Sequence, residues 1–152
     1  MEALIIFIAL IAIGYFMGNM MESRHYKSIE RRERRYLTLP AVDVKHFLDN
    51  PARVEKVQLV HGSVVISIDY FKRLLAGLRN IFGGEVTSYE TLLDRARREA
   101  ILRMKEMAGS SADIILNLRI ETSIIGNNAD KKNSVGSIET IAYGTAITYK
   151  KA

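Results

Sequence analysis

No cysteine occurs among the 152 residues of this chain. Its absence excludes disulfide bonds, zinc ribbons, iron–sulfur clusters and catalysis by a thiol. It also excludes attachment to a membrane through a lipidated cysteine. Any link to a membrane must therefore rest on apolar sequence, and cysteine usage gives no indication of the compartment.

Charge is missing from one long stretch, because Ala3 to Met21 contains no Asp, Glu, Lys or Arg. As a helix this stretch spans about 28 Å, close to the roughly 30 Å of a bilayer's hydrocarbon core. It is apolar on every face, as a helix surrounded by lipid must be. A cleaved signal peptide needs a basic start, whereas the only side-chain charge before the run is Glu2. We therefore predict one retained transmembrane helix rather than a signal peptide or a buried core helix.

Basic residues follow this run directly, and they predict its orientation. Six of them lie within about 15 residues of its end, inside the window of the positive-inside rule. The rule predicts a single-pass protein of the inner (cytoplasmic) membrane, with the N-terminus outside and the domain in the cytoplasm. The same side chains can bind anionic headgroups, or form a solvated helical extension with pairs such as Glu30–Arg34. The six residues are Arg24, Lys27, Arg31, Arg32, Arg34 and Arg35.

The rest of the chain predicts an α+β domain with an antiparallel or mixed sheet and helices on one side. The expected order is strand, helix, helix, strand, strand. The corresponding segments are Glu55–Ser67, Ile68–Phe82, Thr87–Ala108, Asp113–Ile125 and Ser137–Tyr149. Three parts result: an anchor at 1–21, a basic juxtamembrane helix and linker at 22–53, and the domain at 54–152.

Two positions carry specific expectations about packing. Gly62, inside the first strand, predicts a bulge or a close approach of another backbone. In the strand that begins at Asp113, strict alternation puts Ile114, Leu116 and Leu118 on one face. It puts Ile115 and Arg119 on the opposite face.

Candidate chemistry is sparse. The three histidines, His25, His46 and His61, are scattered, and no two have the spacing of metal ligands. His61 and His46 are the candidate ligands for a divalent transition metal, if the fold brings carboxylates or another subunit to them. The alternative is that both are ordinary histidines with a hydrogen-bond partner. No serine or threonine has an identifiable base, so we predict neither a catalytic site nor a bound cofactor. Nucleic-acid binding is not expected either, because the densest basic run adjoins the membrane segment.

The arrangement of several motifs resembles the YbjQ-like family, also called the heavy-metal-binding domain family. The likeness covers roughly residues 54–149. Gly62 and Val64 match its first strand, and Ile114 to Ile120 its alternating strand. The other matching residues are Gly83, Gly84, Tyr89, Ala96, Arg97, Ala100, Gly144, Thr145, Ala146 and Ile147. Ser110 to Ile115 departs from the family's Gly-Ala-x-Ala-Val and puts the local turn in doubt. The resemblance implies an α+β fold that assembles into ring-like homo-oligomers, specifically pentamers, and it implies little about activity.

Three functions remain open at this point. The favoured one is a non-enzymatic module on the cytoplasmic membrane face that assembles with itself and recruits an unidentified protein partner. A metal-binding or metal-sensing protein is the alternative, and it rests on the family's label together with His46 and His61. An enzyme whose site forms between subunits is the third.

Overall fold

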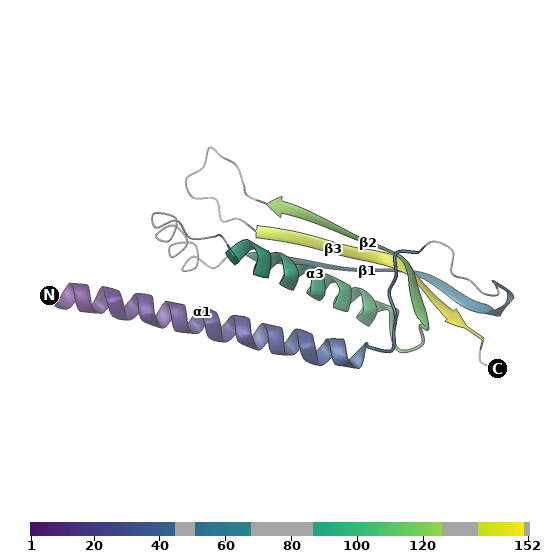
Figure 1. The fold of residues 1–152 in the computed structure, drawn as a ribbon, viewed down its shortest axis with the longest axis horizontal. Helices are drawn as coiled ribbons and strands as arrows, with labels where there is room; N and C mark the ends of the chain where they lie inside the picture. Colours follow the sequence, from purple (N-terminus) through teal and green to yellow (C-terminus); the bar gives the residue numbers. More distant parts are fainter. Residues whose placement is uncertain (45–50, 68–86, 126–136, 151–152) are drawn as a thin grey trace.

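The computed structural model describes residues 1–44, 51–67, 87–125 and 137–150. The described residues form two helices and three strands, as expected of an α+β chain (Figure 1). The elements are α1 (Glu2–Arg35), the single 3₁₀ turn η1 (Pro51–Arg53), β1 (Val54–Ser67), α3 (Thr87–Ala108), β2 (Ile114–Ile125) and β3 (Ser137–Tyr149). The predicted class is therefore confirmed. The helix predicted at Ile68–Phe82 lies outside the described residues.

The sheet is antiparallel, with strand order β1–β3–β2. β3 is the central strand, so Tyr143 pairs with His61 on one side and with Arg119 on the other. The segment after α1 extends this sheet at the start of β2, where Ala41 forms a parallel bridge with Ile115. Its backbone bonds run from Val42 N–H to the Ile115 carbonyl and from Ile115 N–H to the Pro40 carbonyl, both at 2.9 Å. Residues predicted as a linker thus contact the domain through main-chain hydrogen bonds.

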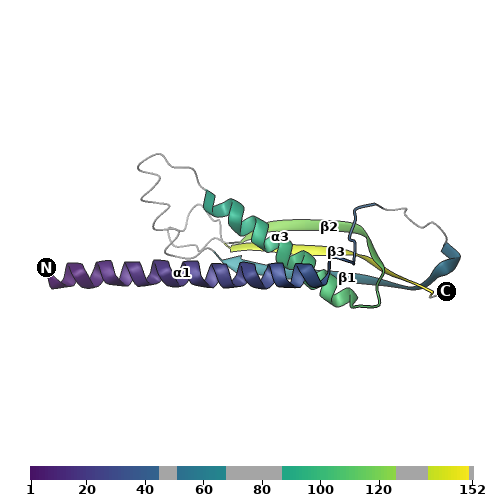
Figure 2. The ribbon, with the colours of Figure 1, turned by 60° about the horizontal axis from the view of Figure 1, so that its bottom comes forward.

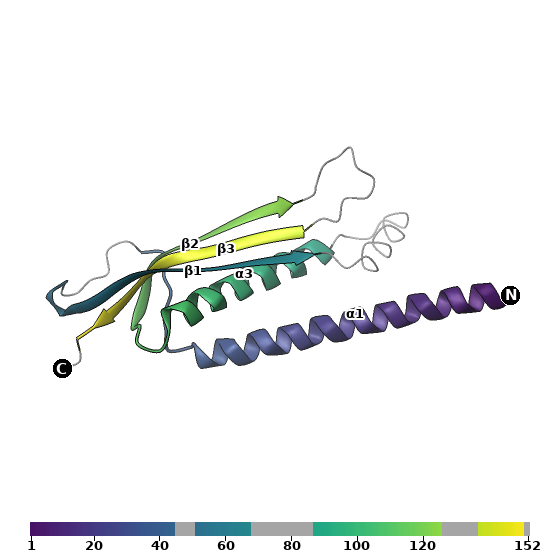
Figure 3. The same ribbon diagram turned by 180° about the vertical axis from the view of Figure 1, so that it is seen from behind.

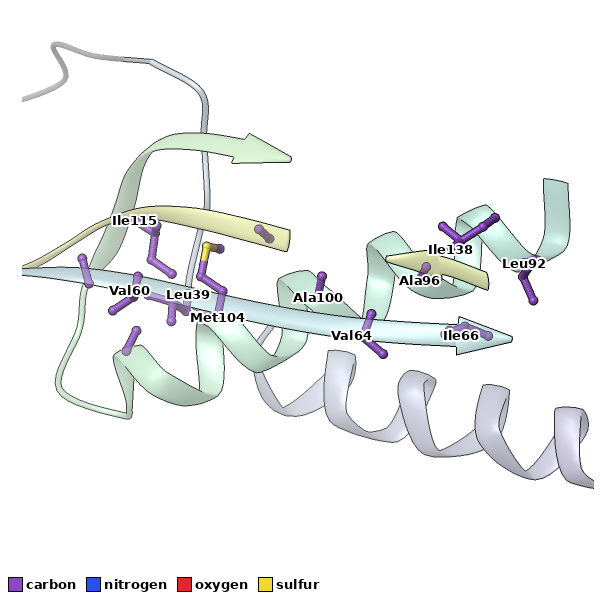
Figure 4. Close-up of a cluster of buried hydrophobic side chains, with 13 residues drawn as sticks. Leu39, Val60, Val64, Ile66, Leu92, Ala96, Ala100, Met104, Ile115 and Ile138 are labelled. Carbon is purple, nitrogen blue, oxygen red and sulfur yellow. The ribbon is translucent and has the colours of Figure 1, made fainter. Parts of the chain in front are cut away.

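The core lies between α3 and the helix-facing side of β1 and β3 (Figure 4). Alternate residues of β1, namely Val60, Gly62, Val64 and Ile66, point to α3 and are buried, as period-two side-chain alternation requires. Ala96, Ala100 and Met104 of α3 meet them at helical spacing. The apolar stripe predicted for this helix is confirmed at these positions.

Gly62 is the point of closest approach between β1 and α3. A Cβ atom at this position would collide with the Ala100 carbonyl oxygen and the Met104 backbone nitrogen. These are main-chain atoms of a helix, which cannot rotate away as the end of a side chain can. The expected close approach is confirmed, and its cause is the absence of a side chain.

The alternation predicted for β2 is wrong near its start. The register shifts between Leu116 and Arg119, and Asn117 there has a φ of 55°. This irregularity offsets the pattern by one residue, as a β-bulge does. Ile115 and Leu118, which strict alternation places on opposite faces, consequently both pack against the main core. Ile114 and Leu116 pack with Ile147 in a separate cluster.

α1 is one continuous helix of 34 residues, without a break between its apolar and charged halves. α3 lies between α1 and the sheet, so the molecule has three layers, as Figures 1 and 2 show from two directions. Seen from behind in Figure 3, the N-terminal half of α1 extends well past the start of α3. By length and composition, this helix is long and apolar enough to cross a membrane.

Candidate functional site

The charged half of α1 packs along α3 through polar contacts. The Tyr26 hydroxyl donates to the Thr91 carbonyl at 3.0 Å, and the Arg98 guanidinium lies over the Tyr26 ring, 5.8 Å from its centroid. Arg98 also donates two hydrogen bonds to Glu33, at 2.8 and 2.6 Å, the paired geometry that a guanidinium and a carboxylate favour. Ile29, on the same side of α1, is completely buried. The contact faces of the two helices therefore carry complementary charges and include buried apolar surface.

Glu99 is the most deeply buried charged residue of this interface, with a side chain only 4% exposed. Arg32 of α1 pairs with it, and Arg103, one turn along α3, donates to it at 2.9 Å. His25 Nε2 lies 3.6 Å from the same carboxylate. Burial acts to raise the pKa of Glu99, but the hydrogen bonds from Arg32 and Arg103 outweigh it and hold the pKa below its usual value. Glu99 is thus an ionised carboxylate held between two helices.

The structure divides the six basic residues that sequence reasoning treated as one group. Arg32 is drawn into the interface and pairs with Glu99 and Glu106. The others are exposed on the face of α1 that points away from α3: Arg24, Lys27, Arg31, Arg34 and Arg35. A helical period of 3.6 residues explains the division, because Glu22, His25, Ile29 and Arg32 share the other face. This separation of charge along α1 was missed from the sequence, although its three- and four-residue spacing was the available signal.

The structure describes one of the two candidate metal ligands. His61 is exposed on β1, in register with Tyr143, and His46 lies outside the described residues. Within the part of the chain that the structure describes, no group of three or more His, Cys, Asp or Glu side chains is placed to hold a metal ion. The described histidine with a carboxylate nearby is His25, which was not a candidate.

The remaining motif residues are distributed over the domain. Arg97 is exposed on α3, Tyr89 lies in the first turn of that helix, and Gly83 and Gly84 fall outside the described residues. Thr145 lies on β3 in register with Leu59 and Leu116. A Cβ at Gly144 would lie 2.8 Å from Ile115 Cγ2 and 3.0 Å from the Leu116 carbonyl. Gly144 therefore accommodates the irregularity in β2, which is a packing role.

A shallow cleft of about 330 Å³ lies where α1 ends beside α3. Leu39 and Ile101 form part of its apolar lining, and the Glu33–Arg98 pair borders it. Lys105 Nζ, also in the lining, donates to the Tyr36 carbonyl at 3.3 Å and so caps the end of α1. Its principal cationic groups are thus occupied by protein partners, and the cleft offers an apolar recess rather than an anion site.

Comparison with known proteins identifies relatives of the domain. The family model described as "YbjQ_1: Putative heavy-metal-binding" matches residues 45–150. A UPF0145 protein from Hahella chejuensis is 41% identical over 62% of this chain and 84% of its own length. One from Dehalococcoides mccartyi is 39% identical with the same coverage of both chains. One from Psychrobacter arcticus is also 39% identical, over 73% of this chain and 65% of its own length.

Among solved structures, a protein of unknown function of the DUF74 family from Pediococcus pentosaceus is similar with a TM-score of 0.47 and 15% identity. That match covers 74% of this chain and 98% of the other. The family model begins beyond α1, so the interface of α1 with α3 is an addition to the matched region. Glu99 lies within that region, whereas its partner Arg32 lies outside it. On the match over residues 45–150, this chain belongs to the YbjQ_1 family of UPF0145 proteins.

Proposed function

We propose that this chain is a UPF0145 domain held on the cytoplasmic face of a membrane by the N-terminal half of α1. There it assembles with itself, in a ring of the pentameric kind that the family resemblance implies, and presents a surface to a protein partner without catalysing a reaction. The observation that carries the proposal is the contrast along one unbroken helix. Its first half is apolar and exposed, and its second half is bound to the domain by ion pairs.

The exposed apolar half of α1 supports membrane anchoring. Ile5, Phe7, Leu10 and Phe16 are each more than half exposed, and they lie on several sides of the helix. Contiguous apolar surface of this extent is rare on soluble monomers and typical of a helix in lipid. The segments follow the proposed division: 1–21 as anchor, 22–53 as juxtamembrane helix and linker, and 54–152 as the domain.

The outer face of the sheet supports self-assembly. Val57 and Leu59 of β1 and Ile141 of β3 are exposed on the side of the sheet opposite α3. An antiparallel sheet with one solvated face normally alternates apolar and polar residues, so exposed Val, Leu and Ile on that face favour a further protein layer. A neighbouring copy is the partner that the family's assembly into rings suggests.

Reporter fusions test the topology. Green fluorescent protein fused after Ala152 should fluoresce, and alkaline phosphatase fused there should be inactive, because the exposed cations hold that end in the cytoplasm. Changing Arg24, Lys27, Arg31, Arg34 and Arg35 together to Glu should reduce or scramble this orientation. Arg32 is left unchanged so that Glu99 keeps its partner. Active phosphatase on the unmodified chain would contradict the proposal.

Metal binding is the second candidate, and the family's own description favours it. It would require His61 to meet ligands from another subunit or from residues outside the described ranges. Elemental analysis of the full chain, purified without an affinity tag, separates the two functions. Stoichiometric zinc, copper or nickel that is lost in a His61→Ala variant would support the metal function over a purely structural module.

A further inference from the structure

α1 and α3 run in the same direction, and their contacts fix the level of one helix against the other. Tyr26 contacts Thr91 and Glu33 contacts Arg98, which lie two turns apart on each helix. Glu22, the first charge after the apolar run, lies 3.9 Å from Arg95, about two turns from the start of α3 at Thr87. Figures 1 and 3 show the start of α3 beside the middle of α1. The start of α3 therefore lies near the level at which the apolar run of α1 ends.

The sheet ends close to the same level. β1 meets α3 at Gly62, against Ala100 and Met104, and then runs toward the start of α3 as far as Ser67. These five residues of strand cover about 17 Å. The helix from the middle of this contact back to Thr87 covers about 22 Å. The strand ends thus stop roughly 5 Å short of the start of α3.

The two ends of the sheet differ in chemistry. Near Ser67, the last two rows across the sheet are Ile66–Ile138–Ile124 and Ser67–Ser137–Ile125, without a charged side chain. Ile124 and Ile125 are 55% and 45% exposed, and the nearest charge along β3 is Glu139 in the row behind. The opposite end carries charges on every strand or next to it: Arg53, Glu55, Lys56, Asp113 and Lys150. Among the described residues, the end that faces the same way as the apolar half of α1 carries no charged side chain.

We propose that Ile124 and Ile125 form a second contact with the lipid bilayer, in the headgroup layer beside the anchor. The inference rests on the proposed anchoring, which puts the hydrocarbon boundary near Met21 and Glu22. The headgroup region extends about 5–7 Å beyond that boundary, and the strand ends lie within this distance. Apolar side chains without charged neighbours are favoured in this layer. The charged end of the sheet, about 40 Å away along β1, remains in water.

This second contact restrains the tilt of the domain. A domain joined to a membrane by one helix is free to lean with that helix, whereas two separate contacts define a plane. The outer face of the sheet then stands roughly upright on the membrane and open to the side, where a neighbouring copy in the same membrane can reach it.

Site-directed spin labelling tests the contact in the full chain, since the absence of cysteine removes any background labelling. The chain is reconstituted in bilayers of phosphatidylcholine and phosphatidylglycerol, with a nitroxide at Ile125→Cys. A second label is placed at Ser67→Cys in the same row. Met107→Cys is the matched control, because Met107 is also an exposed apolar residue but lies near the end of α3 that points away from the anchor, and not on the outer face of the sheet. Accessibility to oxygen is compared with accessibility to a water-soluble nickel complex.

Labels at Ile125 and Ser67 should show an oxygen-to-nickel ratio several-fold higher than the label at Met107. A ratio equal to that of the control overturns the inference, as does a label shielded from both reagents, which would indicate a protein neighbour. A label at Ile8→Cys separates this failure from failure of the proposed function. If Ile8 reports hydrocarbon while Ile125 reports water, the anchoring stands and only the second contact is wrong. If Ile8 itself reports water, both are wrong.

Discussion

The two sides of α3 are held by different forces. Toward the sheet, Ala96, Ala100 and Met104 are buried without exposed surface and Gly62 lets the two backbones meet. Toward α1, the contacts include several ion pairs and hydrogen bonds, and Ile29 is buried on the same side of α1. Close apolar packing is insensitive to salt and intolerant of added volume, whereas ion pairs are screened and depend on protonation. We therefore expect α3 to stay packed against the sheet as long as the domain is folded. Its interface with α1 should weaken at high salt or low pH.

We expect the largest loss of stability from a substitution where α3 packs against the sheet. Gly62→Ala adds a Cβ where two helix backbone atoms already lie, so α3 and β1 must separate. We expect a loss of about 3 kcal/mol in the free energy of unfolding, at the upper end for overpacking. Urea unfolding of the full chain in mild detergent, followed by circular dichroism, measures it. Ser63→Ala, one residue along on the exposed face, should change stability by less than about 0.5 kcal/mol. Equal stability of the two variants would show that the contact is looser than described.

A charge introduced at the edge of the core should give the second-largest loss of stability. Leu118 packs against the main core from the irregular part of β2 and is only partly buried. Leu118→Asp should lower the free energy of unfolding by about 2 kcal/mol, since the new carboxylate loses part of its hydration but can still reach water. Arg119→Ala, on the exposed outer side, is the matched control and should be mild. If Arg119→Ala proved as damaging as Leu118→Asp, the two faces of β2 would not differ as described.

These two neighbours also mark how far the sequence could predict the fold. Periodicity placed the strand and the α3 helix, because each depends on residues near one another in the chain. The glycine within the first strand indicated the close approach at Gly62 but not the helix that makes it. It failed at Asn117, since a bulge depends on how β2 fits β3 and on the extended segment around Ala41 that joins its edge. One irregular residue then reversed the face of Ile115.

The site shows the same limit. The apolar run of α1 and the basic residues after it are readable from composition alone. The pairing of Arg32 with Glu99 depends on how two helices pack against each other, because these residues lie 67 positions apart in the chain. The spacing of Glu22, Ile29 and Arg32 indicated that they share one face of α1. The sequence did not indicate which helix packs against that face.

Substitutions where α3 packs against α1 should lower stability less, and their effect should be confined to α1. Glu99→Gln keeps the shape of the side chain but leaves Arg32 and Arg103 facing a neutral group. We expect the free energy of unfolding to fall by about 1–2 kcal/mol, because a buried charge pair loses one member while the amide still accepts a hydrogen bond. Amide hydrogen exchange should speed up in residues 22–35 of α1 and not in β1 or β3. Glu106→Gln, at an exposed carboxylate that also contacts Arg32, should leave exchange nearly unchanged. Faster exchange throughout the sheet would contradict the idea of two separable sides.

Acid should give the smallest effect under ordinary conditions. The pKa of Glu99 is depressed in the folded chain, so its ionised form contributes stability above its ordinary value of 4.5. That contribution should be lost progressively as the pH falls below this value. The α1 segment of the wild type should therefore loosen between pH 5 and pH 3, and the Glu99→Gln variant should lack this part of the pH dependence. Identical pH profiles of exchange in α1 would show that Glu99 does not hold the interface.

The most direct test of the account is a cysteine scan along α1 in membranes, with a maleimide that cannot cross lipid. Each variant carries one cysteine, at an exposed position of either half: Phe7, Leu10, Phe16, Ser28, Arg31 or Arg34. The account predicts that the first three are unreactive until detergent is added. It predicts that the last three react in inside-out vesicles and not in sealed right-side-out vesicles. Reaction at Phe7, Leu10 and Phe16 without detergent, or reaction at Arg31 from the outer side, would contradict the proposed membrane anchor and its orientation.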